Sequence, residues 1–129
     1  MSPAAALRRA LGPVFVAAGV LHFTHTSAFA AIVPDALPAH RELVWASGVA
    51  EIVGGLAVMH PRTRPLGGLW LVAVLLAVFP ANVHMAVHAE RYPALPEALL
   101  WLRLPLQGAL IWWAWNATQD RRRRGTTRV

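Results

Sequence analysis

The stretch that decides the fold is residues 66–87, LGGLWLVAVLLAVFPANVHMAV, which runs for the length of a membrane span without a charged side chain. A helix needs about 20 apolar residues to cross the hydrocarbon core of a bilayer. Three further stretches approach that length, so we expect spanning helices at about residues 7–29, 43–59, 66–87 and 99–117. Because none of them alternates apolar and polar residues, they are predicted to be helices and not barrel strands.

Composition also favours a membrane protein. Of the 129 residues, 57% are hydrophobic and only 14% are charged. A soluble domain of this size could not bury so much apolar surface, so the lipid bilayer is the expected surrounding. We therefore predict an all-α membrane protein with a single domain over residues 1–118, an antiparallel bundle of four transmembrane helices. The basic residues 119–129 are expected to form a disordered cytoplasmic tail.

The arginines predict the orientation of this bundle. Most of them lie at the start of the first span, between the second and third spans and after the fourth: Arg8, Arg9, Arg62, Arg64 and Arg121–Arg124. In the other two loops, Arg41 and Arg91 are balanced or outnumbered by acidic residues. By the positive-inside rule both termini are then cytoplasmic. Because most of the arginines lie at the termini and in one loop, and not along a helix face, nucleic acid is not an expected partner.

A signal peptide is the alternative interpretation of the first apolar stretch. Arg8 and Arg9, an apolar run and then Ala28-Phe29-Ala30 fit a leader with a small-residue cleavage site. Pro13 and the polar residues 22–27, HFTHTS, are unusual in such a leader. We therefore expect the first helix to be retained.

One carboxylate lies deep in the second predicted span. Glu51 is eight residues from the outer end of that span, which places it ~12 Å below the membrane interface. An unpaired ionised carboxylate at the centre of a spanning helix costs roughly 2.5–3.5 kcal/mol. Glu51 is therefore expected to be neutral, paired or in a hydrated cavity.

The other spans supply polar side chains at similar depth. We expect Glu51 to form an ion pair with Arg103, extended by three more residues into one buried polar cluster in the outer half of the bundle: His22, Asn82 and Gln107. Two roles remain open for this cluster, since it would either fix the packing of the helices or form a ligand or proton site.

The second span also carries small residues at four-residue spacing. Ala46, Ala50 and Gly54 share one face, and Ser47, Glu51 and Gly55 share the next. Small residues allow helices in lipid to approach closely. Glu51 is thus predicted to border the tightest packing surface of the chain.

The histidines permit a metal or haem interpretation. His22 and His25 lie on the first span, and His84 and His88 on the third. A His-x3-His spacing suits a metal but is common by chance, and no carboxylate or Cys accompanies either pair. We expect no metal, with His84 and His88 as the remaining candidates.

With these motifs placed, the chain resembles the DoxX-like family of small four-helix membrane proteins. The resemblance rests on six segments in order: AGVLHF (18–23), IVPDALP (32–38), SGVAEIVGG (47–55), HPRTR (60–64), VFPANVHMA (78–86) and RLPLQ (103–107). It implies a bacterial inner membrane location and four spanning helices. Some members of that family are small subunits of membrane oxidoreductases that pass electrons to quinone, and others belong to oxidative-stress assemblies.

Three functions follow as expectations. The first is a non-catalytic subunit or assembly partner of a membrane oxidoreductase complex, acting with another membrane protein or a second copy. Catalysis by this chain alone is not expected, because it has no Cys and no recognisable haem or flavin motif. The second is a protein that binds quinone or a similar small molecule through Arg103, Gln107, Asn82 or His22. The third is a small proton-coupled transporter that uses Glu51.

Overall fold

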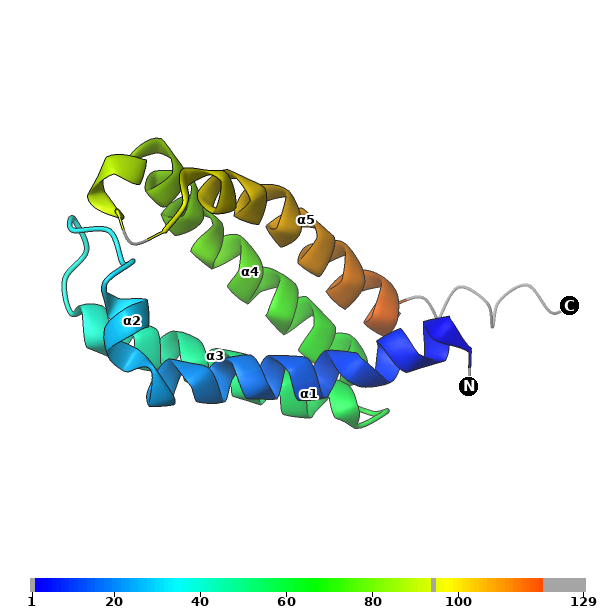
Figure 1. Ribbon diagram of the computed structural model, residues 1–129. Coiled ribbons are helices and arrows are strands. Elements are labelled where there is room, and N and C mark those ends of the chain that lie inside the picture. The colour runs from blue at the N-terminus through cyan, green and yellow to red at the C-terminus, as the bar shows by residue number, and fades with distance from the viewer. Residues whose placement is uncertain (1, 94, 120–129) are drawn as a thin grey trace, which may run out of the picture.

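The computed structural model describes residues 2–93 and 95–119, and all regular elements of this part of the chain are helices (Figure 1). In chain order they are α1 (Pro3–Thr24), α2 (Thr26–Ala30), α3 (His40–Met59), α4 (Arg64–Val87), the 3-10 helix η1 (Ala89–Arg91) and α5 (Glu97–Gln119). The prediction of an all-helical protein is confirmed. The predicted disordered tail lies outside the described residues, apart from Gln119, which ends α5.

Three helices, α1, α3 and α4, are long and apolar enough to cross a membrane. The expectation of four spans is thus supported for three of them. Helix α5 is 23 residues long, but its apolar character is diluted by several polar side chains, among them Arg103 and Gln107. Large apolar side chains cover the outside of the molecule, for example Leu66 at 72% and Trp112 at 65% exposure. Such a surface is suited to lipid and not to water.

The prediction of one continuous helix over residues 7–29 is wrong. The helix begins earlier, at Pro3, and is interrupted at His25, whose φ and ψ of −124° and 38° are not helical. Hydroxyl groups beside the break bond to carbonyls of the preceding turn: Thr24 Oγ1 donates to Leu21 O, and Thr26 Oγ1 donates to His22 O at 2.9 Å. Such side-chain bonds compete with the helix and explain why it ends there.

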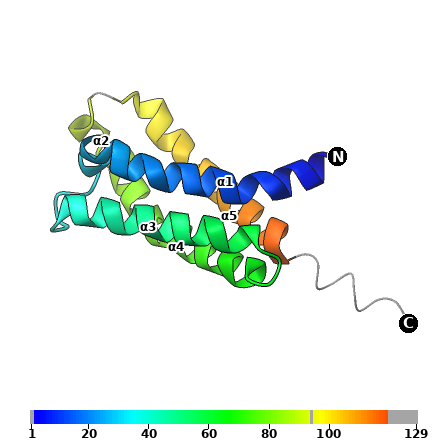
Figure 2. The same ribbon diagram turned by 90° about the horizontal axis from the view of Figure 1, so that it is seen from below.

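Glycines join α1 to α3 along most of their length. A Cβ atom on Gly55 would lie 2.8 Å from the Gly12 carbonyl oxygen and 2.9 Å from Val16 N, and one on Gly48 would lie 2.9 Å from the Gly19 carbonyl oxygen. The two backbones can approach this closely only because no side chain stands between them. Figure 2 shows the two helices lying side by side.

The two helix pairs, α1 with α3 and α4 with α5, meet at one end of the molecule. We call it the narrow end; it holds the beginnings of α1 and α4 and the ends of α3 and α5 (Figure 1). Gly54 there faces Leu71, Gly67 faces Val58, and all four long helices contribute to one buried cluster: Leu11, Phe15, Val58, Leu71, Leu75 and Ala114. Trp113 Nε1 also donates to Leu7 O at 3.0 Å and ties α5 to α1.

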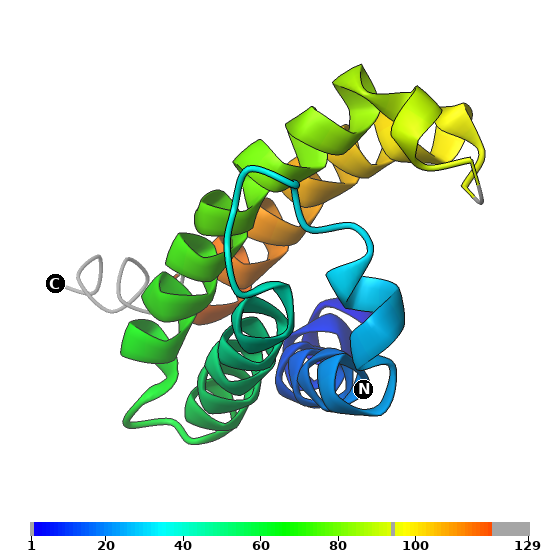
Figure 3. The same ribbon diagram turned by 90° about the vertical axis from the view of Figure 1, so that its left-hand side faces the viewer.

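The helix pairs diverge toward the opposite, wide end, where α2 and the 31–39 segment lie (Figure 1). The 31–39 segment passes between the two pairs at this end (Figure 3). It enters α3 through Ala39, which has a left-handed φ of 53°. An exposed ion pair, Arg91 Nη1 to Asp35 Oδ2 at 3.7 Å, links this segment to η1. Partial burial and the Asp35 carboxylate raise the pKa of the neighbouring Tyr92, while Arg91 opposes this shift.

Candidate functional site

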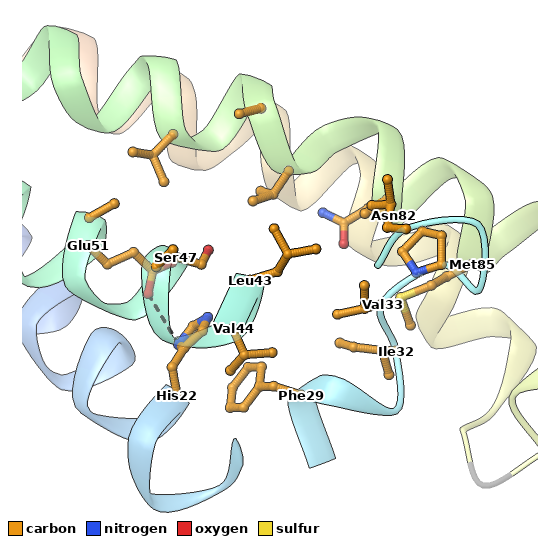
Figure 4. A pocket seen from close by; sticks show the side chains of 18 of the residues that line it. His22, Phe29, Ile32, Val33, Leu43, Val44, Ser47, Glu51, Asn82 and Met85 are labelled. Atoms are coloured by element: carbon orange, nitrogen blue, oxygen red, sulfur yellow. Dashed lines mark ion pairs between the residues drawn. The ribbon is translucent and has the colours of Figure 1, made fainter. Parts of the chain in front are cut away.

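The polar centre of the wide end is the pair formed by His22 and Glu51. His22 lies in the last turn of α1, and Glu51 lies in the middle of α3. The close approach of Gly19 and Gly48 brings these two turns together, since a Cβ on Gly48 would lie 2.8 Å from His22 Cβ. As a result, His22 Nδ1 is 3.4 Å from Glu51 Oε2 (Figure 4).

The expected ion pair between Glu51 and Arg103 is wrong. Within the described residues, the basic side chain within 4.0 Å of Glu51 is that of His22. Arg103 is exposed and belongs to α5, which packs mainly on α4. Because the helix pairs diverge at this end, residues of equal depth on α3 and α5 lie on opposite sides of the opening. Depth along a helix axis was predicted from the sequence, but lateral distance was not.

One oxygen of Glu51 has no hydrogen-bond partner among the described residues, although it is buried. The reason lies in the orientation of His22, whose Nδ1 is 2.7 Å from the Ala18 carbonyl oxygen. A carbonyl only accepts, so Nδ1 carries a hydrogen that points to Ala18, and Nε2 is the acceptor of the neutral ring. His22 therefore lies beside Glu51 Oε2 without donating to it. A buried acceptor without a donor costs about 1–3 kcal/mol, which a donor on a ligand would recover.

Asn82 and Gln107 form a second polar group, between α4 and α5. Asn82 Nδ2 donates to Gln107 Oε1 at 3.4 Å, and Gln107 Nε2 donates to Leu75 O at 2.6 Å. Both side chains are buried. Gln107 fixes α5 against α4 and holds the Asn82 side chain in place.

Four of the five predicted residues lie on the walls of one cavity of about 410 Å³. His22, Glu51, Asn82 and Arg103 line it, whereas Gln107 is not among its lining residues. Asn82 lies across the cavity from His22 and Glu51 (Figure 4). The rest of the lining is mostly apolar and comes from α2, the 31–39 segment, α3 and α4, including Phe29, Val33, Val44, Val78 and Met85.

Two of the lining residues that were not predicted as part of the site lie next to the His22–Glu51 pair. Ser47 lies one turn before Glu51 on α3, and their four-residue spacing on one face was the available signal. Phe29 stacks on the His22 ring, with centroids 4.2 Å apart and planes 17° apart. No sequence signal pointed to Phe29, because its contact with His22 depends on the break at His25.

The two remaining metal candidates lie one turn apart at the end of α4, where His88 is the C-cap residue. The His84 and His88 rings have centroids 4.3 Å apart, and His88 Nδ1 is 3.0 Å from the His84 carbonyl oxygen. Within the described ranges, no group of three or more His, Cys, Asp or Glu side chains is placed to hold a metal ion. This pair therefore lacks a third protein ligand there.

The fold and site thus define a helical protein with at least three membrane-compatible helices and an apolar cavity with polar groups on facing walls. A family model described as a domain of unknown function (DUF8561) matches residues 11–118, and the chain belongs to that family. No curated protein and no solved structure matches the chain. The resemblance to the DoxX-like family stays a prediction.

Proposed function

We propose that this protein binds a small amphipathic molecule of the quinone and quinol class in the wide-end cavity. The observation that carries the proposal is the buried Glu51 oxygen without a donor, which lies in a largely apolar cavity of about 410 Å³. Ligand pockets typically have volumes of about 300–1,000 Å³ and combine apolar walls with a few polar groups that orient the ligand. The cavity fits that description.

The facing walls offer complementary hydrogen-bonding groups. The Glu51 carboxylate on α3 accepts hydrogen bonds and suits the hydroxyl group of a quinol. Arg103 on α5 only donates and suits a carbonyl oxygen. A flat ring with an oxygen at each end would use both walls, while its apolar tail would contact Val44, Val78 and Met85. A purely apolar ligand would leave the Glu51 oxygen without a donor.

Binding is better supported than proton-coupled transport. The cavity lining includes none of the residues of the narrow-end cluster, which fills the space between the four long helices there. A transported molecule would have to pass this cluster, which includes the bulky side chains of Phe15 and Leu71. A bound ligand needs only the cavity and a rotation of the Glu51 carboxylate that brings the buried Oε2 to the cavity surface.

The cellular setting belongs to the same proposal. We place the chain in a bacterial inner membrane with α5 as a fourth span and both termini cytoplasmic, as a non-catalytic subunit or assembly partner of an oxidoreductase-type complex. The arginine distribution supports the orientation. Alkaline phosphatase fusions after Gln119 and within residues 31–39 test it: activity only in the second fusion is expected, and the reverse pattern would contradict it. Co-purification from native membranes tests for the partner.

Binding itself is tested with the reduced, quinol form of a short-chain ubiquinone analogue, whose hydroxyl group can donate to Glu51, added to the purified full chain in detergent. Trp70 Nε1 donates to Ala50 O at 2.9 Å, one residue from Glu51, so tryptophan quenching should report occupancy. Ala81→Leu should abolish saturable quenching because Ala81 lines the cavity. Ala73→Leu adds the same side chain to an exposed position of α4 and serves as the control. Equal quenching of all three proteins would contradict the proposal.

A second substitution separates ligand binding from a purely structural role of the His22–Glu51 pair. Glu51→Gln keeps the size of the side chain but changes its hydrogen bonding. If the pair only fixes the packing of α1 on α3, thermal stability should fall while quenching by the analogue is unchanged. If Glu51 holds the ligand, the affinity for the analogue should fall about tenfold, because the amide oxygen of Gln accepts a weaker hydrogen bond than a carboxylate does.

A further inference from the structure

The narrow end holds a second cavity, also of about 410 Å³, at the opposite end of the molecule from the proposed ligand site. Its lining comes from the first turns of α1, the end of α3 and the start of α4. Three of the lining residues are arginines: Arg8, Arg9 and Arg64. No carboxylate is among the lining residues of this described cavity, so its charge is positive.

Arg64 is already fixed in position. Its Nε donates to the Val58 carbonyl oxygen at 2.9 Å, and the residue is half-buried. This bond orients the planar guanidinium group and, among the described residues, leaves its two terminal NH₂ groups without a hydrogen-bond partner. A guanidinium held in this way binds phosphate oxygens through two parallel bonds.

The surroundings of the three arginines are apolar. Gly12, Val58 and Met59 complete much of the lining, and Met59 is 53% exposed. Leu7 and Leu66, within two residues of the arginines in sequence, are also largely exposed. The cavity therefore opens between a positively charged rim and the apolar outer surface of the helices. If α1, α3 and α4 span a membrane, their ends lie at the level of the lipid headgroups.

We propose that this cavity is a binding site for the phosphate headgroup of an anionic phospholipid. The three guanidinium groups bind the phosphate, and the exposed apolar surface beside Met59 takes the upper part of an acyl chain. The location agrees with the predicted cytoplasmic side, where anionic lipids attract basic residues. The site is independent of the quinone proposal, because the two cavities share no lining residue.

The test is native mass spectrometry of the full chain in detergent, titrated with dioleoyl phosphatidylglycerol and, separately, with the phosphatidylcholine of the same acyl chains. We expect one phosphatidylglycerol molecule to bind saturably and at least tenfold more tightly than phosphatidylcholine. Arg8→Gln and Arg64→Gln should each weaken binding about fivefold. Equal binding of the two lipids would overturn the proposal.

Arg62→Gln is the matched control. Arg62 lies two residues before Arg64 and carries the same charge, but it is exposed and does not line the cavity. Its substitution should change binding less than twofold, and a loss equal to that of Arg64→Gln would show a diffuse charge effect in place of a site. The Arg8 side chain makes no hydrogen bond within the described residues, so Arg8→Gln decides the question even if Arg64→Gln fails to fold.

Inorganic phosphate distinguishes a lipid from a soluble anion. It lacks the acyl chains that contact the apolar side of the cavity, so we expect millimolar phosphate to leave the phosphatidylglycerol adduct unchanged. Displacement of the lipid by phosphate at that concentration would show a site for a free anion and would overturn the lipid assignment.

Discussion

The two ends of this molecule are built from the same four long helices but are packed in opposite ways. At the narrow end, Gly54 and Gly67 allow α3 and α4 to approach closely, and a cluster of buried apolar side chains fills the centre. At the wide end, larger residues such as Leu43, Val78 and Met85 face the space between the helix pairs, and a cavity remains between them. The cavity of the narrow end lies instead at the helix ends, beside its arginines. In lipid, where helices gain little from hiding apolar surface, the position of small residues decides where helices touch.

The same difference separates the chemistry of the two ends. The narrow end carries arginines at its rim and apolar side chains inside. The wide end carries its polar groups inside, where His22, Glu51 and Asn82 face the cavity. Close packing leaves no room for a ligand beside a buried polar group. An open space between helices can hold both the polar groups and a ligand that forms hydrogen bonds with them.

The largest expected effect on stability comes from breaking a glycine contact. Gly55→Ala would place a Cβ 2.8 Å from the Gly12 carbonyl oxygen, so α1 and α3 must move apart. We expect a loss of about 2–3 kcal/mol in the free energy of unfolding. Gly108→Ala is the control, since nothing lies within 4 Å of a Cβ there. It should gain roughly 0.5–1 kcal/mol, because alanine favours the helix. Denaturant unfolding in detergent measures both.

The next effect comes from the polar bonds between α4 and α5. Gln107→Leu removes the acceptor of Asn82 Nδ2 and leaves this buried donor without a partner. We expect a loss of about 1–2 kcal/mol. Adding Asn82→Leu should recover part of it, because the orphaned group is then gone as well. Losses that simply add in the double variant would contradict the pairing.

A smaller effect is expected where the cavity provides room. Ala81→Leu adds three carbon atoms at the wide end, and we expect the unfolding free energy to change by less than about 1 kcal/mol, against the 1–3 kcal/mol typical of an overpacked core. Thermal unfolding of this variant beside Gly55→Ala gives the comparison directly. A similar loss in both would show that the wide end is packed as closely as the narrow end.

The smallest effect is expected from the ion pair that links the 31–39 segment to η1. The side chains of Arg91 and Asp35 are 52% and 81% exposed. Exposed pairs contribute about 0–1 kcal/mol, and salt weakens them. Arg91→Gln should therefore lower stability by less than about 1 kcal/mol at low ionic strength and have no effect in 1 M salt. A large loss that persists in salt would indicate a packing role for this arginine.

Much of the fold could be predicted from the sequence. The long apolar stretches gave α3, α4 and α5 to within three residues at each end. They also placed His22, Glu51 and Asn82 at a similar depth, since the rise per residue of a helix is fixed. The break at His25 was not predicted. It depends on the hydroxyl groups of Thr24 and Thr26, which donate hydrogen bonds to backbone carbonyls of the preceding turn.

The sequence by itself determined an apolar, all-helical chain and the position of each polar residue along its helix. These properties follow from local chemistry, namely hydropathy, helical rise and the charge of the loops. Only the tertiary structure decided that His22, and not Arg103, lies beside Glu51. It alone also showed that a cavity separates Glu51 from Asn82. The reason is that glycine contacts set the lateral distances between helices, and such distances arise only when two helices pack against each other.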